Sequence, residues 1–197
     1  MRSEARAARA KEIEAAAYRV LDAKGYEGLS MQAVAKDAKA SNETLYRWYG
    51  DKTGLFEALI AGNTALVRAA LEEAQEGAPL EVLARVGPVL LNMLLGPRAV
   101  ALNRAAAADA SGTLGRALGK AGRETVAPWI AGVMQRARDE GILRGEPMEM
   151  AEAWFALLIG DLQVRRVTGA MAPPDAEVVA ERAAQALARL QRLFPPD

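Results

Sequence analysis

The sequence predicts an all-α protein in which an N-terminal three-helix unit precedes a larger helical domain. Apolar residues make up 51% of the 197 residues and recur at helical spacing along most of the chain. No Asn-Gly or similar turn separates alternating apolar runs, so β-hairpins are not expected. Cap and turn residues divide the chain into about nine helices. These helices are expected over 4–24, 31–38, 42–49, 52–75, 79–95, 98–109, 112–140, 147–168 and 175–194.

Individual cap residues justify the boundaries of the early helices. Gly25 ends the first helix, because glycine readily takes the left-handed conformation that closes a helix. Ser30, Ser41 and Asp51 are good N-caps for the next three helices. Pro128 falls inside the helix expected over 112–140, so that helix is either kinked or split in two.

The composition excludes most catalytic and metal-binding chemistry. The chain has no cysteine and no histidine, which removes thiol nucleophiles, imidazole bases, disulfides and the usual zinc or haem ligand sets. No cluster of carboxylates and lysines in the sequence replaces them. The sequence therefore predicts a protein that is not an enzyme and needs no cofactor or metal.

The net charge does not indicate a partner, whereas the hydropathy of the sequence predicts the location of the protein. The net charge is zero, and residues 1–52 carry ten Lys or Arg against eight Asp or Glu. No apolar segment typical of a signal peptide follows the N-terminal residues. The longest strongly apolar stretch, 153–160, is far shorter than the roughly 20 residues of a membrane-spanning helix. We expect a cytoplasmic protein with no membrane span.

The short helices over 31–38 and 42–49, joined by about three residues, have the dimensions of a helix-turn-helix motif. In that motif the second helix enters the major groove of DNA and presents its side chains to base edges. The apolar residues spaced to form the small core are Val34, Ala35, Ala38 and Leu45, closed by Val20, Leu21 and Leu55 or Phe56. The side chains left on the outer side are Ser41, Asn42, Thr44, Tyr46, Arg47 and Trp48.

The segment from Ala35 to Lys52 resembles the DNA-binding signature of the TetR family of transcriptional regulators. The residues that carry the resemblance are Ser41, Thr44, Leu45, Tyr46, Tyr49 and Lys52. The resemblance covers roughly residues 10–56, and elsewhere only the order of helices agrees. It implies a DNA-binding three-helix unit and a homodimer on a palindromic operator, in a family whose members mostly repress.

The resemblance also implies roles for single residues. Asn42 and Arg47 would face bases or backbone, Thr44 and Tyr46 would contact phosphates, and Lys52 would hold a phosphate. A lysine in the first turn of a helix opposes the helix dipole, which favours an anion opposite Lys52. The alternative is a solvated lysine that the preceding aspartate partly neutralises.

Four further residues of the motif leave alternatives open. Gln32 either reaches the DNA backbone or is an ordinary surface residue, and Trp48 either packs along the backbone or covers the edge of the small core. Glu43 would repel phosphate, and either accepts from a cytosine amine or favours the helix dipole. Lys39 replaces the glycine common in the family, so a positive φ there would cost about 1 kcal/mol. The predicted DNA-binding residues are Gln32, Lys39, Ser41, Asn42, Glu43, Thr44, Tyr46, Arg47, Trp48 and Lys52.

The last two helices are predicted to form a dimer interface. They are apolar over much of their circumference and must be covered by their own domain or by a partner. The resemblance implies the second option, a four-helix bundle formed with a symmetry mate. The predicted interface residues are Trp154, Phe155, Leu158, Leu162, Val179, Ala183, Leu187 and Leu190. Burial within one subunit is the alternative.

The segment over 158–165 also resembles the equivalent helix in the AefR-like branch of the same family. Gly160 would allow another helix to approach closely. We expect Asp161 to be a buried carboxylate paired with Arg165 or Arg166, in a structural role.

The middle helices are expected to enclose a pocket for a small-molecule inducer. Its predicted lining is Met93, Leu94, Leu102, Trp129, Val133 and Met134, with Asn103, Arg104 and Gln135 as polar anchors. Methionine and tryptophan also serve as ordinary core residues. This lining suggests an apolar or aromatic compound.

Together these features predict a ligand-responsive regulator that a small molecule releases from a double-stranded DNA operator. The DNA-binding domain is expected over residues 1–52, and the ligand-binding and dimerisation domain over residues 53–197. A helical protein–protein adaptor without DNA binding is the alternative. Thr44, Tyr46 and Lys52 favour DNA, because together they suit an anion.

Overall fold

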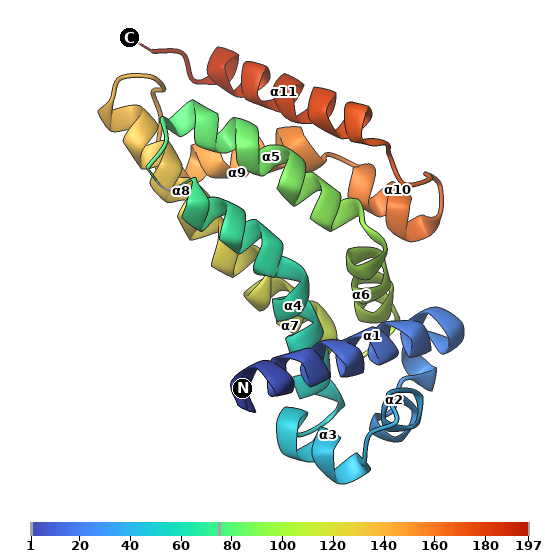
Figure 1. Cartoon of the computed structure of the whole chain (residues 1–197). Coiled ribbons are helices and arrows are strands. Elements are labelled where there is room, and N and C mark those ends of the chain that lie inside the picture. The colour runs from blue at the N-terminus through green and yellow to red at the C-terminus, as the bar shows by residue number, and fades with distance from the viewer. Residues whose placement is uncertain (1, 75, 197) are drawn as a thin grey trace. The chain divides into compact units, whose positions relative to one another are not determined.

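The computed structural model describes residues 2–74 and 76–196, which form helices joined by turns with no strand among them. The chain divides into two compact units, which Figure 1 shows together. The first unit comprises Met1–Gly62 and Ala101–Ala121, and the second comprises Asn63–Val100 and Gly122–Asp197. Helices α4 (Lys52–Glu73) and α6 (Pro97–Ala108) contribute residues to both. The first compact unit is thus larger than the expected domain of residues 1–52.

The first unit also contains α1 (Arg2–Gly28), α2 (Met31–Asp37), α3 (Asn42–Tyr49) and α7 (Thr113–Ala121). The expected caps are confirmed. Gly25 interrupts α1 with a φ of 66°. Ser30 and Ser41 accept hydrogen bonds at 3.1 Å from the backbone of Ala33 and Thr44. The Asp51 carboxylate likewise accepts from the backbone N–H of the third residue after it at 2.9 Å.

The core of the first unit joins α1, α2 and α3 to α4, α6 and α7. It buries the eight apolar residues expected there: Val20, Leu21, Val34, Ala35, Ala38, Leu45, Leu55 and Phe56. Leu102 from α6 and Leu114 from α7 are buried in the same cluster. The Tyr18 hydroxyl donates to the carbonyl of Leu59 at 3.1 Å, so this buried polar group is satisfied. These contacts explain why residues 101–121 belong to the first unit.

The second unit is a bundle of α5 (Pro79–Leu95), α8 (Arg123–Asp139), α9 (Pro147–Ile159), α10 (Leu162–Thr168) and α11 (Ala176–Leu193). Helices α8 and α11 each pack on both α5 and α9, and α11 runs alongside them in Figure 1. Trp154 is among the largest fully buried side chains, 1% exposed. A Cβ on Gly87 would lie 3.2 Å from that of Ala183, so glycine lets α5 and α11 approach closely here.

Two of the expected helices are broken in the structure, so the described residues run from α1 to α11 instead of forming nine helices. Gly160 takes a φ of 51° between α9 and α10, a conformation that side-chain-bearing residues rarely adopt. Gly122, with a ψ of −87°, separates α7 from α8. Pro128 lies inside α8, which continues past it, so the break occurs at the glycine before α8 and not at the proline.

In the second unit, buried or partly buried arginines donate hydrogen bonds to backbone carbonyls near the C-terminal ends of helices. Arg166, 9% exposed, donates from Nε to the Leu95 carbonyl at the end of α5, at 3.0 Å, and from Nη1 to the Met171 carbonyl at 2.7 Å. Arg182 donates to the carbonyl of Leu158 near the end of α9 at 3.0 Å. The expectation of a buried Asp161 paired with arginine is wrong. Asp161 is exposed, and Arg166 binds backbone carbonyls instead of the Asp161 carboxylate.

By length and composition alone, α4 is long and apolar enough to cross a membrane. Helices α5 and α6 pass the same test only if this bent pair is counted as one span. In the structure α4 contributes Leu55, Phe56 and Leu59 to the core of the first unit. Core helices of soluble proteins have the same composition, so this is weak evidence for a span.

Candidate nucleic-acid interface

Helix α3 carries a polar outer face on one buried anchor. Leu45 is fully buried, whereas Ser41, Asn42, Glu43 and Arg47 are exposed and Tyr46 is 55% exposed. Thr44 is half-buried, and its hydroxyl lies 2.9 Å from that of Ser41. Six of the predicted DNA-binding residues therefore form the polar face of one short helix and its N-cap, and the seventh on this helix, Trp48, is half-buried. Such a face can offer hydrogen bonds to base edges and phosphates.

Glu43 and Arg47 lie one helical turn apart on this face. The Arg47 Nη1 and Glu43 Oε1 atoms are 3.7 Å apart, and both side chains are largely exposed. An exposed pair of this kind contributes little to stability. Glu43 therefore has a partner that lowers its repulsion of phosphate, while Arg47 remains accessible on the surface.

The turn between α2 and α3 contains an unusual residue. Lys39 has a φ of 49°, and it is the only residue other than glycine with a positive φ in the described part of the chain. The positive φ whose cost was considered for this position is thus present in the structure. The Lys39 side chain is exposed, as is that of Gln32 at the start of α2.

Trp48 is half-buried and packs against the core of the first unit, which agrees with the interpretation that it covers the core edge. The Arg6 guanidinium lies 5.3 Å from the centroid of its ring. Next to it, the Tyr49 hydroxyl is buried with no hydrogen-bond partner in the described structure. Burial raises the pKa of Tyr49, and Glu14 raises it further against an opposing effect of Arg6.

Lys52 has an intramolecular partner that the sequence did not reveal. Its Nζ donates to the Tyr26 carbonyl at 2.8 Å and lies 3.6 Å from the centroid of the Tyr26 ring. Desolvation lowers the pKa of Lys52, and the carboxylates of Asp109 and Glu27 oppose this shift. An ammonium has three N–H donors, so this contact leaves donors for a phosphate.

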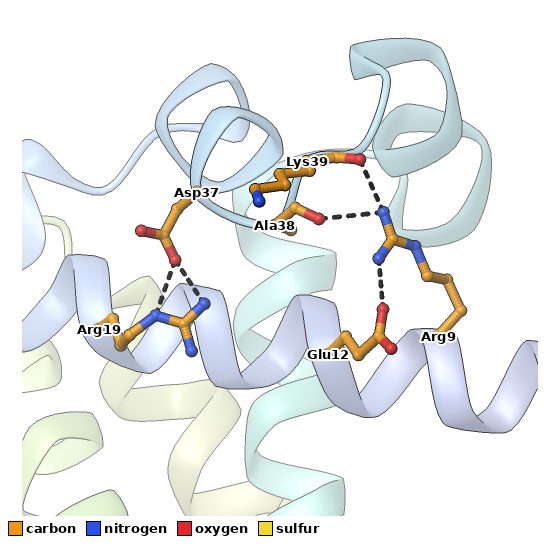
Figure 2. Close-up of polar contacts among 6 residues, drawn as sticks. All are labelled: Arg9, Glu12, Arg19, Asp37, Ala38 and Lys39. Atoms are coloured by element: carbon orange, nitrogen blue, oxygen red, sulfur yellow. Dashed lines mark hydrogen bonds and ion pairs between the residues drawn. The ribbon is translucent and has the colours of Figure 1, made fainter.

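Two arginines of α1 bind the helix-turn-helix, as Figure 2 shows. Arg9 donates to the carbonyls of Ala38 and Lys39, and Arg19 pairs with the Asp37 carboxylate. Sequence reasoning missed both arginines because each contacts a residue at least 18 positions away. A helical pattern gives no signal for such contacts.

Sequence comparison identifies this helix-turn-helix. Residues 13–59 match the sequence model of the bacterial regulatory proteins of the tetR family, and residues 81–192 match that of the AefR-like transcriptional repressor C-terminal domain. The second match covers more than half of the chain. The chain belongs to the TetR family. It is accordingly a DNA-binding transcriptional regulator of the repressor type and not an enzyme.

Solved structures show the same TetR fold. A TetR transcriptional regulator from Agrobacterium tumefaciens is 29% identical with a TM-score of 0.76, and covers 96% of this chain and 95% of its own. A TetR-family regulator from Mesorhizobium loti MAFF303099 is 23% identical with a TM-score of 0.78, and the match covers 95% of this chain and 97% of that protein. The flavonoid-responsive regulator FrrA is 24% identical with a TM-score of 0.71, and the match covers 95% of this chain and 97% of FrrA. A search of curated proteins found no match.

The residues predicted for an inducer pocket are divided between the units of this TetR-family chain. Leu102, Asn103 and Arg104 belong to the first unit, and Leu102 is buried in its core. The others belong to the second unit: Met93, Leu94, Trp129, Val133, Met134 and Gln135. Val133 and Met134 are buried in its core, and Met93 accepts a hydrogen bond from Asn63 at 3.1 Å.

The residues predicted for a dimer interface also fall into two groups. Five are buried in the core of the second unit: Trp154, Leu158, Val179, Ala183 and Leu190. They are covered within the unit because α9 and α11 pack on each other and on α5, as in the alternative of burial within one subunit, and a role for them in a dimer interface stays a prediction. Phe155, Leu162 and Leu187 are half-buried, so an interface that includes them stays a prediction.

Proposed function

We propose that two copies of this regulator bind a palindromic operator in the cytoplasm and that a small molecule releases them. The observation that carries the proposal is the polar face of α3 over the buried anchor Leu45. A two-fold dimer places two such helices about 34 Å apart, one turn of DNA, which matches a palindrome.

Within each half-site, Asn42 and Arg47 are proposed to read bases, and Thr44 and Tyr46 to bind phosphates. The exposure of Asn42, Tyr46 and Arg47 supports these roles. Lys52 would add a phosphate contact with the donors that its bond to Tyr26 leaves unused.

This reading is tested by selecting binding sites from random duplex DNA with the full chain, then titrating the selected site at two salt concentrations. We expect a palindrome that binds more weakly as salt rises. Asn42→Ala should cost about 1 to 3 kcal/mol of binding and relax base preference at one position of each half-site. Lys52→Ala should weaken binding to every sequence and reduce the salt slope by about 1. Selection of no sequence would contradict the proposal.

The dimer interface is proposed to lie on α9, α10 and α11, around Phe155, Leu162 and Leu187. Their partial exposure supports it, together with the exposed apolar side chains of Val164 and Val178 on α10 and α11. Surfaces that a partner covers typically expose more apolar area than the rest of a protein surface.

Leu187→Glu tests this interface by placing a charge within it. We expect a monomer in sedimentation equilibrium and at least a tenfold loss of operator affinity, because an unpaired charge in an apolar interface is costly. Gln185→Glu is the matched control, since residue 185 is exposed and lies about 200° around the same helix. A Leu187→Glu chain that stays dimeric would exclude this surface.

The inducer is proposed to be apolar or aromatic and to bind the second unit near Met93, Trp129 and Met134. The apolar character of these side chains supports this class, as does the naming of FrrA as flavonoid-responsive. Titrating the operator complex with a flavone, with palmitate and with glucose tests it. Release by the flavone or palmitate alone is expected, and release by glucose alone would contradict it.

A further inference from the structure

Arg9 makes a contact that neither the motif nor the helical pattern explains. Its Nη2 donates to the Ala38 carbonyl at 3.0 Å and to the Lys39 carbonyl at 2.8 Å, while its Nη1 pairs with Glu12 on the same helix. Figure 2 shows the guanidinium between α1 and the turn, with all three acceptors around it. One side chain of α1 thus binds two consecutive peptide groups of the turn before α3.

Those peptide groups are the ones whose conformation is least favourable. Lys39 holds a φ of 49°, which costs a residue with a side chain about 1 kcal/mol relative to glycine. Hydrogen bonds from a charged donor are roughly twice as strong as neutral ones. The bonds from Arg9 therefore act where the turn would otherwise favour another backbone conformation.

The turn determines the direction in which α3 leaves α2. Ser41, the N-cap of α3, follows Lys39 after one residue, so a change of φ at Lys39 would reorient the whole of α3. Leu45 is the one side chain that α3 buries fully, and Trp48 and Tyr49 pack partly against the same core, so the turn acts together with these contacts to fix the orientation of α3.

We propose that Arg9 is a positioning residue for operator recognition: its bonds to the Ala38 and Lys39 carbonyls hold the turn in the conformation that aims α3. The inference rests on the proposed role of α3 in base recognition. The proposal separates Arg9 from a phosphate-binding arginine, because three of its five N–H donors bind two carbonyls and the Glu12 carboxylate, and that carboxylate also offsets its charge.

Arg19 provides the matched comparison on the same helix. Its Nε and Nη2 lie 2.9 and 2.6 Å from Oδ2 of Asp37, the last residue of α2. The arginine side chain is 58% exposed and the aspartate 38%, so this is a surface ion pair of small value. It binds a side chain and not the backbone of the turn, so its loss should leave α3 in place.

The experiment measures binding of Arg9→Ala, Arg9→Lys and Arg19→Ala chains to the selected operator and to random duplex DNA over a range of salt. For Arg9→Ala we expect about a tenfold loss of operator affinity, unchanged affinity for random DNA and an unchanged salt slope. Arg9→Lys should recover part of the loss, because an ammonium can still donate to a carbonyl. Arg19→Ala should bind within about twofold of the wild type.

Three controls distinguish positioning from other causes. Stoichiometric titration gives the active fraction, which a merely unstable variant would lower without changing affinity or specificity. A salt slope reduced by about 1 would make Arg9 a phosphate contact and overturn the proposal. Unchanged operator affinity in Arg9→Ala would overturn it as well, and Arg9→Lys provides the same test if the alanine variant does not fold.

A second background tests the link to Lys39. Glycine adopts the same φ without strain. In a Lys39→Gly chain, the loss of operator affinity caused by Arg9→Ala should therefore fall from about tenfold to about threefold or less. An equal loss in both backgrounds would show that Arg9 does not act through the turn. If the wild type selects no operator, the proposed function fails, whereas an operator that all variants bind equally refutes this inference alone.

Discussion

Each of the two units has an apolar core, but the polar side chains that bind backbone carbonyls act at different places in the two. In the first unit, polar side chains of α1 and α4 bind the backbone near the helix-turn-helix: Arg9 binds the turn, and Lys52 binds Tyr26. In the second unit, large apolar side chains such as Trp154 and Leu83 fill a bundle core, and arginines close helix ends. The first arrangement fixes the orientation of a small exposed helix. Burial, the larger source of stability, is supplied by both cores, because Phe56 and Leu59 in the first unit are as fully buried as Trp154 in the second.

The largest expected effect comes from replacing the same residue type in each unit. Trp154→Ala removes a 1% exposed side chain from the second core and should cost about 3 to 5 kcal/mol in urea unfolding. Trp48→Ala, at a half-buried position in the first unit, should cost about half as much or less. Equal costs would show that the difference in burial between Trp154 and Trp48 does not set their contributions to stability.

A smaller effect is expected from the polar contacts inside the second unit. Arg166→Met keeps the apolar stem but leaves the Leu95 and Met171 carbonyls without their donor, which should cost about 1 to 3 kcal/mol. Arg165→Met is the matched control, because the neighbouring side chain is exposed and should change stability by less than about 0.5 kcal/mol. If the two variants unfold alike, the carbonyl contacts of Arg166 contribute nothing measurable.

The smallest expected effect concerns a carboxylate of the first unit. Asp109 accepts from the Leu114 N–H at 2.8 Å and from the Ser111 hydroxyl at 2.7 Å, and these bonds lower its pKa below 3.8. A depressed carboxyl pKa contributes stability above pH 3.8 that is lost as the pH falls through the lower, folded-state value.

We therefore expect Asp109→Asn to lower the Tm at pH 7 and to have a smaller effect at pH 3. Asp22→Asn, at an exposed position of the same unit, is the control for the loss of a charge. If the Tm difference between the wild type and Asp109→Asn is the same at both pH values, the carboxylate charge does not stabilise the start of α7.

Local signals in the sequence were enough to predict the helix-turn-helix. Ser30, Ser41, Asp51 and Gly25 act within a few residues of themselves, and the structure confirms each of them. The burial of Leu45 followed from helical spacing in the same way. These features depend on neighbours along the chain, which the sequence displays directly.

Features that depend on distant residues could not be predicted. Arg166 finds its carbonyl acceptor 71 positions away, and the carbonyl that Lys52 binds is 26 positions away. The apolar stripe of α11 shows that something covers it, but not whether α5 and α9 or a second copy does so. In the structure, Val179 and Leu190 on this stripe are covered within the unit.

The pairing of Arg9 with the Lys39 turn also restricts the order in which this protein can change during evolution. From the present chain, losing Arg9 first would leave Lys39 in a costly conformation without its charged donor. Replacing Lys39 by glycine first removes the strain, after which the loss of Arg9 should weaken operator binding less. The same two changes are thus accessible in one order and opposed in the other.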